Sequence, residues 1–85
     1  MKLYYRVKPE EFRACMDRIR DNYGMHEEVD EARTVLKLDD EDKIEQVSGT
    51  FDPRADEVVQ IRVVLVDKSL KGYFDSVLGT PYKVK

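Results

Sequence analysis

His26 is the one histidine of the chain and Cys15 the one cysteine. The carboxylates of Glu27 and Glu28 follow His26 directly and could orient it as a base, since imidazole changes its charge near neutral pH. A single histidine with one distant cysteine does not make a typical zinc site, and no serine or threonine is recognisably paired with the histidine as a nucleophile. The sequence therefore predicts no catalytic residue, and we expect a protein that is not an enzyme.

Charge is sorted along the chain, with net +2 over residues 1–24, −8 over 25–57 and +3 over 58–85. The acidic third contains a run of four carboxylates, Asp39, Asp40, Glu41 and Asp42. A calcium loop needs spaced oxygen ligands, a glycine and a closing glutamate, so the contiguous run predicts neither a metal nor a cofactor. A patch of one sign speeds encounter with an oppositely charged protein. We expect these four residues to contact a basic protein partner; an ordinary solvated face is the alternative.

Basic residues and a tyrosine share the outward side of the first expected strand. Tyr4, Arg6 and Lys8 combine cations with a ring that could stack on an exposed base, and Lys68 and Lys71 could extend this surface. Two observations weigh against it: edge strands commonly carry lysine to prevent sheet pairing, and the isoelectric point is near 5.1. An RNA-binding module is therefore the alternative function. Protein binding and RNA binding both hold if the protein bridges a partner through RNA.

The segment Lys71–Leu78, KGYFDSVL, is similar to the start of the inner strand of the RNA-recognition motif, where aromatic side chains stack on bases. It departs from that family at Phe74, where the family usually has a small residue. Leu70, Tyr73, Phe74, Val77 and Leu78 also recur at helical spacing. We therefore predict a helix here, with Tyr73 and Phe74 as core anchors, and do not assign the family.

Size and composition predict a single folded domain, residues 1–85. Two independent cores would each fall near the size of roughly 40 residues at which metals, disulfides or oligomerisation become necessary. The chain is 41% hydrophobic and 39% charged, which is typical of a soluble domain. Its apolar runs fall far short of the roughly 20 residues that span a bilayer. The unpaired cysteine and the lack of a signal-like segment predict the cytoplasm, and a homodimer interface would add useful burial.

Periodicity predicts an α+β fold. We expect strands over 2–7, 33–38, 43–51 and 58–66, the last being central, and a helix from Pro9 to Gly24. Residues 26–31 read as a connection, 39–42 and 52–56 as turns, and Asp67 or Ser69 as the cap of a second helix ending at Gly79. Residues 82–85 could add a brief edge strand.

These elements predict a small antiparallel sheet of four to five strands with two helices packed on one face. A ferredoxin-like arrangement with one surplus strand fits this order. Together with the missing catalytic residues, the charge pattern predicts a small cytosolic regulatory or inhibitory binding protein. Phages encode proteins of this size and acidity as antagonists of a host enzyme or defence system, and we expect one of that kind.

Overall fold

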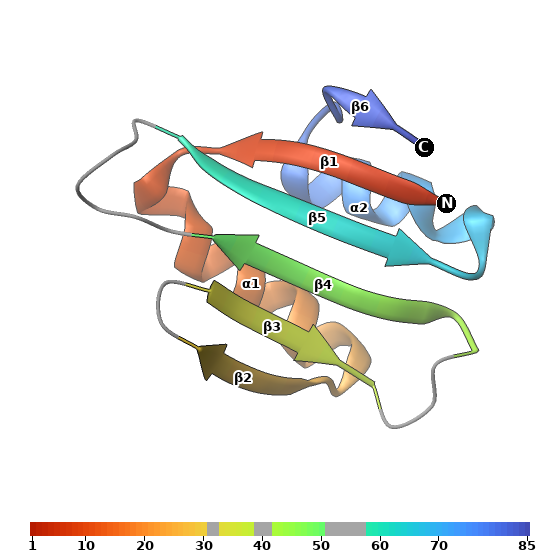
Figure 1. The fold of residues 1–85 in the computed structure, drawn as a ribbon, viewed down its shortest axis with the longest axis horizontal. Helices are drawn as coiled ribbons and strands as arrows, with labels where there is room; N and C mark the ends of the chain where they lie inside the picture. The colour runs from red at the N-terminus through yellow and green to blue at the C-terminus, as the bar shows by residue number, and fades with distance from the viewer. Residues whose placement is uncertain (31–32, 39–41, 51–57) are drawn as a thin grey trace.

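The computed structural model describes residues 1–30, 33–38, 42–50 and 58–85. Within these ranges the elements are β1 (Lys2–Val7), α1 (Pro9–Tyr23), β2 (His26–Asp30), β3 (Arg33–Lys37), β4 (Ile44–Thr50), β5 (Val59–Leu65), the 3-10 turn η1 (Lys68–Leu70), α2 (Lys71–Leu78) and β6 (Lys83–Val84). The described strands form one antiparallel sheet of six, in the order β2-β3-β4-β5-β1-β6. Both helices cover the same face of this sheet and leave the other face open (Figure 1).

The first strand and first helix lie where periodicity predicts them. Leu3, Tyr5 and Val7 alternate with exposed or half-buried neighbours along β1 and enter the core beneath the helices. Helix α1 begins at Pro9, which needs no backbone partner in a first turn, and ends at Gly24. Gly24 has a φ of 61°, the left-handed conformation that glycine adopts freely, and its N–H bonds the carbonyl of Arg20.

The predicted central strand is confirmed, because β5 lies between β4 and β1 and its alternate residues from Val59 to Leu65 are at most 2% exposed. The second helix is confirmed as well. The Asp67 carboxylate accepts a hydrogen bond from the Ser69 N–H at 2.9 Å and starts the η1 turn, which continues into α2. Phe74 is fully buried in this helix, as a core anchor must be.

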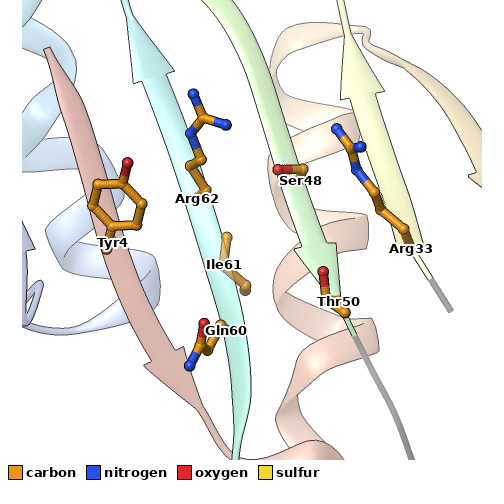
Figure 2. Close-up of a pocket in the computed structure, with 7 residues that line it drawn as sticks. All are labelled: Tyr4, Arg33, Ser48, Thr50, Gln60, Ile61 and Arg62. Carbon is orange, nitrogen blue, oxygen red and sulfur yellow. The ribbon is translucent and has the colours of Figure 1, made fainter.

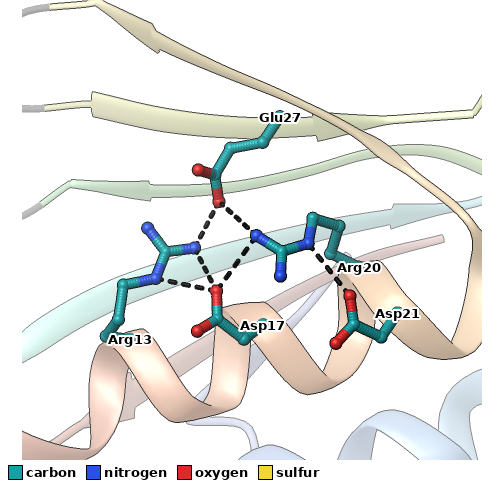
Figure 3. A network of polar contacts seen from close by, with 5 residues as sticks. All are labelled: Arg13, Asp17, Arg20, Asp21 and Glu27. Carbon is teal, nitrogen blue, oxygen red and sulfur yellow. Dashed lines mark hydrogen bonds and ion pairs between the residues drawn. The ribbon is translucent and has the colours of Figure 1, made fainter.

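The interpretation of residues 26–31 as a connection is wrong, because His26–Asp30 form the edge strand β2. The sheet consequently has six strands among the described residues, and the expectation of four to five is wrong too. An edge strand keeps its charged side chains in water while its backbone pairs on one side, so its sequence lacks the apolar alternation of a half-buried strand. Glu27 turns toward the helical layer, where Arg13 and Arg20 of α1 bind its carboxylate (Figure 3).

Helix α1 packs closely on β4 through Gly49. A Cβ atom added at Gly49 would lie 2.3 Å from Cε2 and 2.6 Å from Cζ of Phe12, whose side chain belongs to the buried core. Carbon atoms do not approach this closely, so the ring occupies the space that any larger residue at position 49 would need. A glycine near the end of β4 therefore lets the helix approach the sheet.

Helix α2 is joined to β1 by a partly buried polar contact. The Tyr5 hydroxyl, whose side chain is fully buried, donates a hydrogen bond to Oδ1 of Asp75 at 2.8 Å, and Lys71 Nζ lies 2.6 Å from Oδ2 of the same carboxylate. Burial, and then the bond to Asp75, raise the pKa of Tyr5. The bond from Lys71 is the main cause that lowers the pKa of Asp75.

The turns expected at 39–42 and 52–56 fall mostly outside the described residues; of these positions the structure describes Asp42 alone, in a turn before β4. No helix in the described ranges is long and apolar enough to cross a membrane.

Candidate functional site

The open face of the sheet consists of the strand residues that alternate with the core positions. The strand register aligns them in two rows across the sheet. In one row Ser48 pairs with Arg62, and Arg62 pairs with Tyr4. In the next row the paired residues run across four strands, Arg33, Thr50, Gln60 and Arg6. Paired positions on neighbouring strands have Cβ atoms about 5 Å apart, so each row can contact one ligand.

Cations dominate this face. Six lie on it among the described residues, Lys2, Arg6, Arg33, Lys37, Arg62 and Lys83. The acidic positions that the register gives this face are Glu28 and Asp30 of β2, and Glu45 stands at the irregular start of β4. The local charge is therefore positive although the chain carries net −3.

The arginines of the open face differ from two of those in the helical layer. Arg13 and Arg20 of α1 share the carboxylates of Asp17 and Glu27, at distances that include 2.8 Å and 3.2 Å (Figure 3). In contrast, no carboxylate of the described ranges forms an ion pair with Arg6, Arg33 or Arg62. These three guanidinium groups keep their N–H donors for a ligand.

Two tyrosine rings flank the β1 side of the open face. The Tyr82 ring lies 4.0 Å from the guanidinium carbon of Arg6 and 6.3 Å from the Tyr4 ring, measured to the centroids. Lys83 Nζ lies 5.6 Å from the Tyr4 centroid. Rings held beside cations in this way present both a surface for stacking and a positive charge. The backbone holds this cluster in place, because the Tyr82 N–H, just before β6, bonds the carbonyl of Tyr4 at 2.9 Å and β6 pairs with β1.

A shallow hollow lies between Tyr4 and Arg33, across the middle of the open face. Its volume is about 280 Å3, and its lining consists of Tyr4, Arg33, Ser48, Thr50, Gln60, Ile61 and Arg62. Figure 2 shows the Tyr4 ring beside Arg62 on the neighbouring strand, with Ser48 and Thr50 between the two arginines. The floor is therefore made of hydroxyl and amide groups, with a ring at one side and guanidinium groups around it.

The structure brings together only part of the predicted basic site. Tyr4 and Arg6 lie on the open face, and Lys8 follows at the N-cap of α1. Lys68 and Lys71 lie in η1 and α2 instead, and Lys71 is engaged by Asp75. Of the predicted acidic site, Asp42 is exposed, and Asp39, Asp40 and Glu41 lie outside the described residues.

Sequence reasoning missed Arg33 and Arg62 as partners of Tyr4. The position of Arg62 on the open face was predictable, because alternation over residues 58–66 places it on the side of the strand opposite the buried residues. The position of Arg33 was not predictable from any local pattern. It stands in the acidic third and joins this face only through the register of β3 on β4.

The other chemically reactive residues form no site of their own. Cys15 is half-buried, its Sγ lies 3.8 Å from the carbonyl of Val77, and burial raises the pKa of its thiol. His26 is exposed on β2. The described residues contain no group of three histidine, cysteine or carboxylate side chains placed to hold a metal.

Comparisons of the chain with protein-family models, with curated proteins and with solved structures find no match. The function of the chain is therefore inferred from the chemistry of the open face.

Proposed function

We propose that this protein binds single-stranded nucleic acid, with RNA as the expected form, on the open face of its sheet. The observation that carries the proposal is the group of arginines without carboxylate partners, Arg6, Arg33 and Arg62, beside the rings of Tyr4 and Tyr82. Cations contact phosphates, and aromatic rings stack on unpaired bases whatever their sequence.

The spacing of the cations suits an extended strand. Arg33 on β3 and Arg6 on β1 are three strand intervals apart, or about 14 Å at the usual separation of neighbouring strands. Thr50 and Gln60 stand between them with groups that can bond base edges. A backbone lying across the strands would therefore meet positive charge at both ends and polar groups along the way.

The same face is less suited to an apolar protein interface. The exposed large hydrophobic residues described in the chain are Val29, Val58, Val66, Tyr82 and Val84. They lie on or beside three strands, β2, β5 and β6, and none of them lines the central hollow, whereas a protein interface has an apolar core enclosed by a polar rim.

We further propose a ferredoxin-like fold, which the order of the strands supports. The neighbouring strands β6, β1, β5 and β4, with α1 and α2 as the connecting helices, have the order of a split β-α-β sheet. Strands β2 and β3 extend this sheet at one edge. Sheets of this architecture in RNA-recognition motifs bind RNA on the face that the helices leave open, and the comparison here is one of analogy.

Fluorescence anisotropy with labelled single-stranded RNA, single-stranded DNA and duplexes tests the proposal. We expect binding to a single strand and at least a tenfold loss in the double variant Arg33→Glu/Arg62→Glu. The logarithm of the binding constant should fall with the logarithm of the salt concentration with a slope of about −0.7 per phosphate contact. The double variant should reduce the magnitude of this slope by more than one unit.

The matched control for charge is the double variant Arg18→Glu/Lys68→Glu, which makes the same change in net charge at exposed positions of α1 and η1. A Lys68→Glu variant tests the surface that the sequence alone predicted. Both should bind as the parent protein does. Equal losses in these controls would show that net charge, and not the open face, governs binding, which would refute the proposal.

As a second candidate we propose the cytosolic, dimeric regulator predicted from the acidic run. It is supported by the exposure of Asp42, the described member of that run, just before β4. Purification from the native lysate, with and without nuclease, followed by light scattering separates the two candidates. A stoichiometric protein that survives nuclease supports the regulator, whereas recovery of RNA supports the open face.

A further inference from the structure

We propose that Tyr4 and Arg62 form a subsite for a guanine base, in which the base stacks on the Tyr4 ring while the Arg62 guanidinium donates two hydrogen bonds to O6 and N7. This inference rests on the proposed function and goes beyond it, because stacking and phosphate contacts alone predict no preference among bases.

The geometry of β1 and β5 places the two residues as one unit. Tyr4 and Arg62 are directly opposed in the antiparallel register, so their Cβ atoms lie about 5 Å apart on the same face. Figure 2 shows the Tyr4 ring turned with one face toward the open side of the sheet. Lys83 and Tyr82 flank this ring on the β6 side, at 5.6 Å and 6.3 Å, so a stacked base can extend toward Arg62.

Arg62 is suited to reading this base edge. Its side chain is exposed and forms no ion pair with a carboxylate of the described ranges. Its planar fork of N–H donors matches two neighbouring acceptors, and guanine presents such a pair in O6 and N7. Adenine presents a donor at N6 beside N7, and this donor would face the donors of Arg62.

The other groups of the hollow agree with a single planar base. The volume of about 280 Å3 lies near the lower limit of small-molecule sites, which begin at about 300 Å3. Gln60 is the residue whose amide could read adenine instead. It pairs with Arg6 and not with Tyr4, so a base stacked on Tyr4 meets Arg62 directly and Gln60 only diagonally.

The test measures the affinity of the parent protein for oligouridines that differ at one central base, which is guanine, adenine, inosine or 7-deazaguanine. Inosine retains O6 and N7, whereas 7-deazaguanine lacks the N7 acceptor. We expect guanine and inosine to bind about tenfold more tightly than adenine and 7-deazaguanine, the discrimination of one good bidentate pair.

The variant Arg62→Met keeps an unbranched side chain of similar length but removes every N–H donor. It should reduce the preference for guanine over adenine from about tenfold to about one, while Arg18→Met, which removes the same charge from α1, should leave the preference unchanged. Thermal melting confirms that both variants are folded.

The possible failures are distinguishable. If all four oligonucleotides bind equally, or adenine binds best, while Arg33→Glu/Arg62→Glu still abolishes binding, the guanine subsite is refuted and the open-face proposal stands. A preference for guanine that persists in Arg62→Met also refutes the subsite. If no oligonucleotide binds, both proposals are refuted.

Discussion

The close approach of α1 to β4 predicts that Gly49→Ala destabilises the protein. The new Cβ atom would lie 2.3 Å from Cε2 of Phe12, well inside contact distance. Phe12 is 8% exposed and belongs to the core, so the ring cannot swing away without displacing its neighbours. Overpacking of this kind costs about 1–3 kcal/mol. At about 4–8 °C per kcal/mol for a domain of this size, we expect the melting temperature to fall by roughly 5–20 °C.

Gly72→Ala is the matched control, because a Cβ atom at Gly72 in α2 has no heavy atom within 4 Å. This substitution should stabilise the protein by up to about 1 kcal/mol, since alanine favours helix. Phe12→Leu should relieve the clash, because it removes the ring that the new Cβ atom meets. A double-mutant cycle of Gly49→Ala with Phe12→Leu, measured by chemical denaturation, should therefore show a coupling energy of about 0.5–3 kcal/mol. Equal melting temperatures for Gly49→Ala and the parent protein would refute the close packing of α1 on β4.

Three further predictions concern pH and the open face. The raised pKa of Tyr5 contributes stability that is fully present below about pH 10, the pKa of tyrosine in the unfolded chain, and that is lost as the pH rises above it. Tyr5→Phe should remove this contribution from alkaline unfolding curves. The lowered pKa of Asp75 contributes stability above about pH 4 that is lost as the pH falls, so Asp75→Asn should flatten the acid limb of the same curves. Tyr4→Ala should weaken binding of single-stranded RNA by about 1–3 kcal/mol, measured by anisotropy, and an unchanged affinity would exclude Tyr4 as a stacking surface.

Local periodicity in the sequence was sufficient to predict most elements. Alternation revealed β1 and β5, and apolar spacing with Pro9 and Gly24 at the ends delimited α1. The edge strand β2 could not be found in this way, because His26–Asp30 contains four charged or titratable residues and one exposed valine. Its pairing depends on the backbone of β3 and on the arginines of α1, which are contacts that no local pattern encodes.

The candidate site was only partly predictable for a related reason. Tyr4 and Arg6 are two positions apart on one strand, so alternation alone places them together. Arg33 reaches the same face through two intervening strands, and only the registers of β3 on β4 and of β4 on β5 align it with Gln60 and Arg6. Register between distant segments depends on which side chains fill the shared core, and one sequence does not reveal it.

Mapping of amide chemical shifts during a titration with single-stranded RNA tests the central claim most directly. The open-face proposal predicts that the amides of β1, β4 and β5 shift most, with Tyr4, Ser48 and Arg62 at the centre, while those of α1 and α2 change little. Shifts confined to the helical layer, or no saturable shifts at all, would contradict a nucleic-acid interface on the open face.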